Sequence, residues 1–207
     1  SSAEGTVPFD DKVIACDGIE TFLTQTRPKA FTGQIDVMEL FGGSGTTSRI
    51  LVRRYNAASG INFDLTCGFN GRNPLHAKFL LQYVKEAKPV VVIAAPPCTG
   101  FKGWASLNRI NSPDTFATTL ENSTALAELT AAVAAEQMQN GRHFLVENPQ
   151  GSALFQLPCW QKFVPHVTRV CFHQCQTGLR MKSPPFWPVK KPTEFWASHP
   201  ALVKRVA

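Results

Sequence analysis

Residues 90–98 of this chain read VVVIAAPPC, an apolar run that ends in two prolines and a cysteine. The run is rich in β-branched residues and has no polar position, which is typical of a strand buried in a parallel sheet. Pro96 and Pro97 cannot donate ladder hydrogen bonds, so they end the strand and stiffen the chain there. Ligands of open α/β sheets bind beyond the carboxyl ends of the strands, so Cys98 is placed as a nucleophile would be. Taken by itself, the tripeptide would more often hold an ordinary half-buried cysteine.

Strands and helices alternate around this stretch. We predict further strands at residues 35–41, 62–69, 143–146 and 168–173, and helices at 46–55, 75–87 and 122–140. This order predicts an α/β fold with a mostly parallel sheet and helices on both faces. Residues 1–33 form an N-terminal extension with one helical candidate at 19–25, and residues 34–207 form one domain.

Length and composition fit a single globular domain. The chain has 207 residues, of which 43% are hydrophobic and 17% charged. No apolar run reaches the ~20 residues that a membrane span needs. Six cysteines without small-scaffold spacing predict reduced thiols in an intracellular protein, nuclear or cytoplasmic. The net charge of +6 fits a nucleic-acid partner and, equally well, a merely soluble basic domain.

A glycine-rich turn, Phe41-Gly42-Gly43-Ser44-Gly45-Thr46, joins the first predicted strand to the first predicted helix. Glycine permits positive φ and a close approach of the backbone to a ligand, and the helix start offers free N–H donors. The turn lacks the full dinucleotide fingerprint and the Gly-Lys-Ser/Thr of a P-loop. A nucleoside cofactor such as S-adenosylmethionine fits it better.

A third strand end carries a carboxyl group, because Glu147-Asn148-Pro149 follows the strand predicted at 143–146. Glu147 and Cys98 both lie at carboxyl ends of one predicted sheet, so we expect them to face one cleft. A thiolate can add to an electron-poor ring while an acid engages the ring nitrogen. A lone glutamate here would more often be a capping or surface carboxylate, but the three motifs together are more specific.

These motifs resemble those of the C5-cytosine DNA methyltransferase family. Residues 39–45 resemble its Phe-x-Gly-x-Gly cofactor motif, residues 96–101 its Pro-Pro-Cys nucleophile motif, and residues 147–149 the Glu-Asn-Pro form of its Glu-Asn-Val motif, found in phage-type members. Residues 175–178 and 191–196 are similar to further phage-type segments. The arrangement is also similar to domains in dinoflagellate retroelement polyproteins, which implies a larger parent polypeptide. The resemblance covers roughly residues 35–198.

The resemblance implies a Rossmann-like S-adenosylmethionine-dependent methyltransferase fold and methylation of cytosine in DNA. Cys98 would add to C6 while Glu147 engages N3, on a base that is flipped from the duplex or lies in a single strand. Cofactor contacts are implied for Phe41, Gly42, Gly43, Ser44, Gly45, Thr46, Asn70 and Pro96. Substrate contacts are implied for Pro97, Thr99, Asn148, Pro149, Gln176 and Lys191.

Four departures from the family pattern leave other functions open. Asn70 stands where an acidic residue is expected to hold the cofactor ribose after the second strand, and Lys102 stands where the family has serine. The Gln-x-Arg-x-Arg motif is not evident, and the chain has no room for a large target-recognition domain. The alternatives are a non-catalytic nucleic-acid-binding relic within a retroelement polyprotein, and methylation of RNA.

Two further groups of residues have both a binding and a packing interpretation. Cys171, His173 and Cys175 alternate, and Cys159 or His166 could complete a zinc site. Buried thiols beside a histidine are the favoured interpretation, and we expect no metal. Trp187 and Trp196, close to Lys190 and Lys191, could stack on bases or pack a loop against the core, and the sequence does not separate the two.

Overall fold

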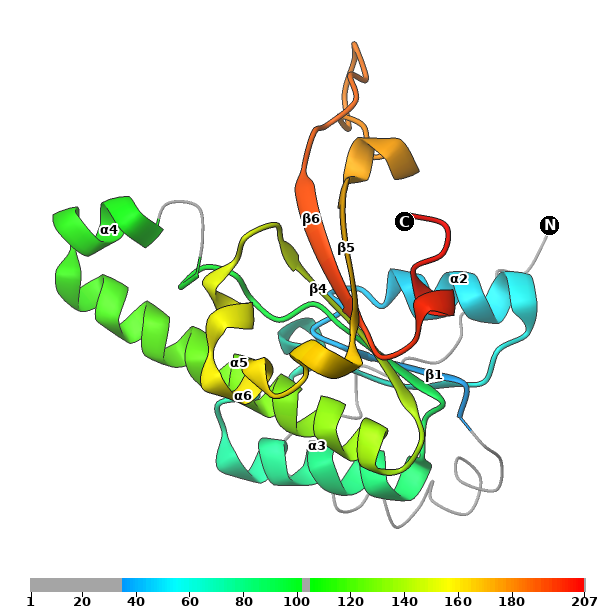
Figure 1. Ribbon diagram of the computed structural model, residues 1–207. Coiled ribbons are helices and arrows are strands. Elements are labelled where there is room, and N and C mark those ends of the chain that lie inside the picture. The colour runs from blue at the N-terminus through cyan, green and yellow to red at the C-terminus, as the bar shows by residue number, and fades with distance from the viewer. Residues whose placement is uncertain (1–34, 102–104, 207) are drawn as a thin grey trace.

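The computed structural model describes residues 35–101 and 105–206, which build a six-stranded sheet of order β2-β1-β3-β4-β6-β5 (Figure 1). The strands are β1 (Val37–Leu40), β2 (Ser59–Phe63), β3 (Val91–Ala94), β4 (His143–Pro149), β5 (Thr168–His173) and β6 (Pro192–Ala197). β2, β1, β3 and β4 pair in parallel, and β6 is antiparallel to both β4 and β5. The predicted α/β class with a mostly parallel sheet is confirmed. The extension at 1–33 and its helical candidate lie outside the described residues.

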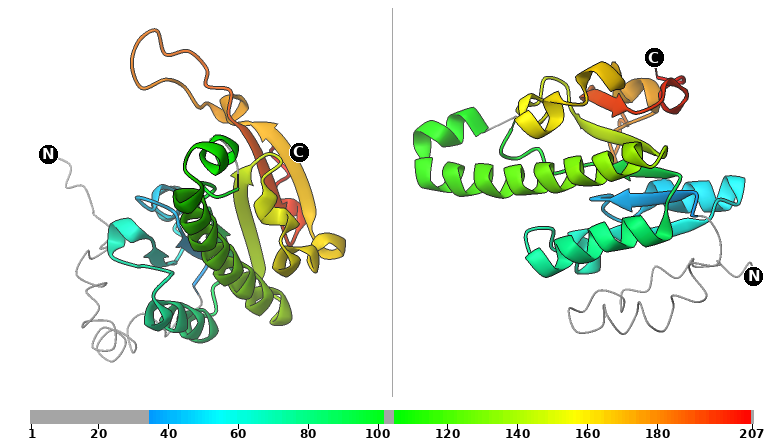
Figure 2. Two further views of the ribbon diagram at one scale, coloured as in Figure 1. Left: turned by 90° about the vertical axis from the view of Figure 1, so that its left-hand side faces the viewer. Right: turned by 60° about the horizontal axis from the view of Figure 1, so that its bottom comes forward.

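Helices lie on both faces of the sheet. They are α2 (Thr46–Tyr55), α3 (Pro74–Ala87), α4 (Ala105–Asn111), α5 (Pro113–Gln139) and α6 (Pro158–Gln161), with 3-10 turns η2 (Leu65–Cys67), η3 (Ala153–Gln156), η4 (Val164–His166), η5 (Gln174–Thr177) and η6 (Pro200–Leu202). Figures 1 and 2 show α3, α5 and α6 on one face and α2 on the other. Within the described part of the chain, no helix has the length and apolar character of a membrane span.

The second strand lies earlier than the 62–69 predicted from the sequence, and that prediction is wrong. β2 is Ser59–Phe63, and Asp64 ends it by capping η2, since its Oδ1 accepts a hydrogen bond from the Thr66 N–H at 2.8 Å. Gly60 lies inside the strand, close to α3. A Cβ there would lie 3.0 Å from the Tyr83 hydroxyl. The first residue after β2 is therefore Asp64.

Strand β4 extends three residues beyond its predicted end. β6 pairs with this extension in antiparallel register, with Glu147 opposite Phe195 and Pro149 opposite Thr193. β3, the other neighbour of β4, ends at Ala94. Glu147 therefore lies within the sheet, held by β6, and not in a loop after the strand.

Aromatic side chains fill the core at both ends of the sheet. The Phe63 ring lies 5.1 Å from that of Phe69 and 5.2 Å from that of Tyr83, both in edge-to-face geometry. At the other end, Phe155 stacks on Trp196 with ring centroids 4.4 Å apart. Trp196 is buried, so the structure decides between its two interpretations in favour of packing.

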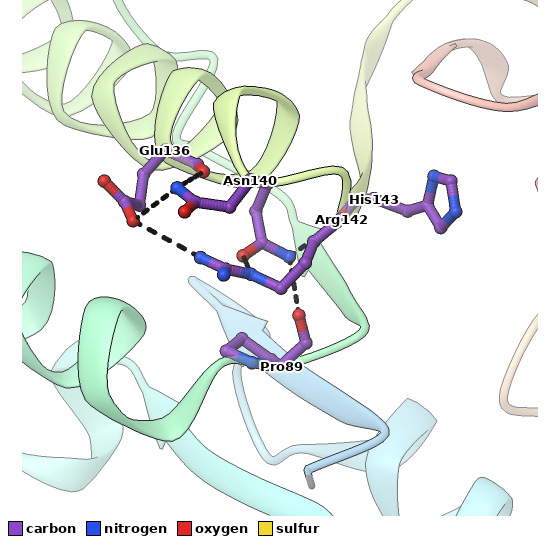
Figure 3. A network of polar contacts seen from close by, with 6 residues as sticks. Pro89, Glu136, Asn140, Arg142 and His143 are labelled. Carbon is purple, nitrogen blue, oxygen red and sulfur yellow. Dashed lines mark hydrogen bonds and ion pairs between the residues drawn. The ribbon is translucent and has the colours of Figure 1, made fainter.

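A polar network ties the end of α5 to the chain entering β3 and β4 (Figure 3). The fully buried Gln137 donates from Nε2 to the Pro89 carbonyl at 2.9 Å and to the His143 carbonyl at 2.8 Å. Its Oε1 accepts from Arg142 Nε at 2.8 Å, and Arg142 pairs with Glu136 at 3.4 Å. The network anchors the amino ends of β3 and β4 to α5. The carboxyl ends of these two strands, at the opposite edge of the sheet, are therefore fixed relative to each other.

Candidate active site

The carboxyl ends of β1 and β3 meet where the strand order reverses. β2 lies on one side of β1 and β3 on the other. Leu40 pairs with Ala94, and the Ala95 N–H donates to the Leu40 carbonyl at 3.0 Å. The glycine turn and the Pro-Pro-Cys segment therefore begin side by side. Open α/β sheets bind their ligands at such a point.

The glycine turn is tight and strained. Phe41, Gly43 and Gly45 have φ values of 58°, 58° and 66°, a conformation that glycine adopts freely and that strains phenylalanine. Gly42 has no room for a side chain, because a Cβ there would overlap the Glu39 carboxylate. A Cβ on Gly43 would meet nothing within 4 Å. A ligand can therefore approach the backbone at Gly43, whereas the Glu39 side chain fills the space beside Gly42.

The start of α2 presents polar groups at the end of this turn. The buried Glu39 accepts a hydrogen bond from the Ser48 N–H and so fixes the first turn of the helix. Gly45, the N-cap, supplies no side-chain cap. Ser44 and Thr46 are exposed, with hydroxyl oxygens 3.0 Å apart. Predicted cofactor residues thus surround a helix N-terminus, a place where backbone N–H groups can donate to a ligand.

An acidic residue, Asp64, directly follows the second strand of the structure. Its Oδ2 accepts a hydrogen bond from the Gly43 N–H at 2.9 Å. Asn70 lies beyond η2, and its side-chain oxygen accepts from the Arg72 N–H at 3.1 Å. The departure assigned to Asn70 came from the misplaced strand boundary. Asn70 stays a predicted contact, and the acid at the strand end is Asp64.

Asn62 lies under the same turn and leaves one acceptor unused. Its Nδ2 donates to the Gly43 carbonyl at 2.7 Å. Its Oδ1 is buried and has no hydrogen-bond partner among the described residues. A buried acceptor without a donor is costly, and because this oxygen is covered by protein atoms it is not open to a ligand.

The loop that carries Cys98 is fastened to α5. Gly100 donates from its backbone N–H to Ser123 Oγ at 3.1 Å, and the Thr99 hydroxyl lies 3.4 Å from the same oxygen. A Cβ on Gly100 would lie 2.8 Å from that oxygen, so glycine is needed for this approach. Cys98 itself is partly buried. The proposed cation at Lys102 falls outside the described residues.

Asn148 joins β4 to the cysteine loop. Its side chain is 1% exposed and donates from Nδ2 to the Pro96 carbonyl at 2.9 Å. Through this hydrogen bond Asn148 holds the strand end before Cys98. Its predicted substrate contact stays a prediction. Pro97 and Pro149 are partly buried near this junction, and their substrate contacts stay predictions.

Glu147 is held by two side chains from the β5–β6 connection. Its Oε1 accepts from Gln174 Nε2 at 3.1 Å and from Lys191 Nζ at 3.2 Å. The structure thus brings the predicted Lys191 to the predicted Glu147. Gln176 instead caps η5, accepting from the His173 N–H at 2.9 Å. Sequence reasoning missed Gln174, because two glutamines two residues apart carry no signal for which one faces β4.

The cysteines and histidines of the zinc alternative do not gather. Cys171 is exposed on β5, and Cys175 lies in η5. Residues 35–101 and 105–206 contain no group of three side chains that could hold a metal ion. Burial, and then the nearby Glu194 carboxylate, raise the pKa of the Cys171 thiol, and burial followed by Glu128 raises that of Cys159. Higher thiol pKa values make both poor nucleophiles.

The site thus combines three groups at one sheet edge: an open glycine turn beside a carboxylate, a thiol on a braced loop, and a carboxyl group oriented by an amide and an ammonium. Such a set can bind an adenosine-like ligand and perform nucleophilic addition with acid assistance. Comparison with family models and with curated proteins found no match for the chain. Its function is therefore inferred from the site.

Proposed function

We propose that the chain transfers a methyl group from S-adenosylmethionine to C5 of cytosine in DNA through a covalent adduct with Cys98. The observation that carries this proposal is the strand register. Leu40, Ala94 and Val146 pair across β1, β3 and β4, so the glycine turn, the Cys98 loop and Glu147 follow in a row along one edge. The same three motifs carry the resemblance to C5-cytosine methyltransferases.

The residues at the end of β1 and β2 suit S-adenosylmethionine, which supplies an electrophilic methyl group. The Asp64 carboxylate can accept hydrogen bonds from ribose hydroxyls. The open space beside Gly43 allows a close approach of the backbone to the ligand. An acid at the end of β2 supports the enzyme over the non-catalytic relic, which Asn70 in that place would favour.

The finer fold assignment, a methyltransferase sheet within the Rossmann-like class, belongs to the same proposal. The reversed strand β6 lies between β4 and β5, unlike the all-parallel order of dinucleotide-binding sheets. The turn also lacks the dinucleotide spacing. Both differences favour S-adenosylmethionine over NAD.

Cys98 and Glu147 divide the work on the ring. The Cys98 thiolate forms a bond to C6, and the electrons of the C5–C6 double bond shift into the ring. The Glu147 carboxyl hydrogen-bonds or protonates N3 as that charge develops. C5 would then form a bond to the methyl group as the bond between that group and the donor sulfur breaks. Loss of the C5 proton and departure of the thiolate would restore the double bond and free the enzyme.

Neighbouring side chains prepare both groups. Gln174 and Lys191 hold Oε1 of Glu147 and leave its other oxygen without a hydrogen bond from the described residues. Asn148 and Ser123 brace the chain on either side of Cys98. Preorganisation of this kind reduces the motion needed to reach the transition state.

The test is a covalent trap. DNA that contains 5-fluorocytosine, incubated with the chain and S-adenosylmethionine, should give a complex that survives denaturation, because fluorine at C5 cannot leave as a proton does. Cys98→Ala should form none, whereas Cys171→Ala, an exposed thiol on β5, should react as the unaltered chain does. No adduct and no labelled methyl transfer to DNA would contradict the proposal, and an adduct on RNA alone would favour the RNA alternative.

A further inference from the structure

The connection from β5 to β6 forms a projecting arm that the proposed chemistry uses only at its base. We define the arm as residues 178–191. The backbone hydrogen bond from Met181 N to Trp187 O is 2.9 Å and that from Val189 N to Leu179 O is 3.0 Å, so the arm is a narrow hairpin. Figures 1 and 2 show it extending well beyond the sheet and away from the helices.

The arm exposes large apolar side chains near its tip. Trp187 is 64% exposed, Phe186 52% and Met181 44%. Trp160 and Trp196, by contrast, are buried in the core. Large exposed apolar groups gathered in one place mark an interaction site. The base-stacking interpretation, excluded for Trp196 by its burial, is thus physically open for Trp187.

The arm is also basic. Its sequence, GLRMKSPPFWPVKK, holds Arg180, Lys182, Lys190 and Lys191 and no acidic residue. Lys191 pairs with Glu147 at the base, and the other three cations are exposed. Aromatic rings interleaved with cations are the composition that binds single nucleic-acid strands, because rings stack on bases and cations meet phosphates.

The arm leaves the sheet at the edge that holds the candidate site. β4 and β5 run in the same direction, because both are antiparallel to β6. The chain that follows β5 therefore starts at the carboxyl edge. At the arm's base, Lys191 Nζ lies 3.2 Å from Glu147 Oε1. A strand whose cytosine reaches Glu147 must pass close to this arm.

We propose that the arm binds an unpaired stretch of DNA beside the target cytosine. Trp187 and Phe186 stack on neighbouring bases, and Arg180, Lys182 and Lys190 contact the phosphates. The inference rests on the proposed function in one respect, which is that the bound nucleic acid is DNA. It assigns nucleic-acid contacts to a short hairpin at the edge of the sheet that holds the candidate site.

The experiment is fluorescence anisotropy of a labelled single-stranded DNA with one cytosine, and of the matching duplex, titrated with the full chain. Trp187→Ala should weaken single-strand binding about 5- to 150-fold, as expected for the loss of one stacked base. Tyr55→Ala is the matched control, because Tyr55 is also 64% exposed and ends α2 at the opposite edge of the sheet. Exchange of both Lys182 and Lys190 for glutamine should lower the slope of log affinity against log salt by about 1.4.

Phe186→Ala should weaken binding in the same direction, and circular dichroism of each variant reports whether it is folded. Unchanged affinity of a folded Trp187→Ala chain overturns the proposal, as does a loss confined to the duplex or an unaltered chain that binds no single strand. The assay needs neither cofactor nor reaction. If the arm variants lose binding but no 5-fluorocytosine adduct forms, only methyl transfer is refuted. If the adduct forms but Trp187→Ala binds as the unaltered chain does, only the role of the arm is refuted.

Discussion

Exchange of Asp64 for asparagine should weaken the binding of S-adenosylmethionine, whereas removal of the Asn70 side chain should not. The two substitutions distinguish between two positions for the end of the second strand. The sequence predicts an end just before Asn70, and the structure has it just before Asp64. Asp64 directly follows β2 and contacts the glycine turn, and Asn70 lies beyond η2. Only the former is adjacent to the backbone that is proposed to approach the cofactor.

The size of the effect follows from the contacts of Asp64. Its two oxygens accept from the Gly43 N–H at 2.9 Å and from the Thr66 N–H at 2.8 Å. Asparagine keeps one acceptor and turns an NH2 group toward the other donor. It also replaces a charged partner of the ribose with a neutral one, and charged hydrogen bonds are worth roughly 1.5–3 kcal/mol against about 1 for neutral ones. A loss of about 1–2 kcal/mol corresponds to a roughly 5- to 30-fold rise in Kd.

Isothermal titration calorimetry with S-adenosylmethionine measures this change on Asp64→Asn and Asn70→Ala. Asp36→Asn is the matched control, because Asp36 also accepts a backbone N–H, from Ala58 at 2.8 Å, but at the amino edge of the sheet. The control and Asn70→Ala should bind as the unaltered chain does. If Asn70→Ala loses affinity and Asp64→Asn keeps it, the reasoning from the strand boundary is refuted.

Two further outcomes follow from buried groups. Asn148→Ala should lower the free energy of unfolding by about 1–3 kcal/mol, because the Pro96 carbonyl loses its buried donor; urea denaturation measures this, and an unchanged midpoint would contradict the positioning role. Burial raises the pKa of Tyr83 to about 12, whereas tyrosine ionises near 10 in an unfolded chain. This contribution to stability should be complete below pH ~10 and should be lost, in total roughly 3 kcal/mol, as the pH rises through about 12. Thermal unfolding against pH should show a shallower decline for Tyr83→Phe, and equal slopes would refute the assignment.

Local sequence determined much of the framework. The helix predicted at 46–55 and the strand at 168–173 have the bounds of α2 and β5. α3 was predicted within one residue, since Asn73 caps it and Pro74 occupies its first turn. The apolar run before Pro96 forms β3 as expected. These elements are specified by periodicity, caps and breakers that lie within a few residues of each other. The motifs at Gly43, Cys98 and Glu147 are also short stretches of consecutive residues, so they could be found in the sequence alone.

Tertiary structure decided the features that depend on partners distant in sequence. β6, which local pattern did not predict, extends β4 through Glu147 by pairing. β2 ends at Phe63, and this boundary places Asp64 directly after the strand, where it accepts a hydrogen bond from the distant Gly43 N–H. Gln174 and Lys191 reach Glu147 across 27 and 44 residues of sequence. Burial separates Trp196 in the core from Trp187 on the arm. Residue type and spacing encode what a segment can do, but which side chains meet, and which stay exposed, is determined only when strands far apart in the chain pair.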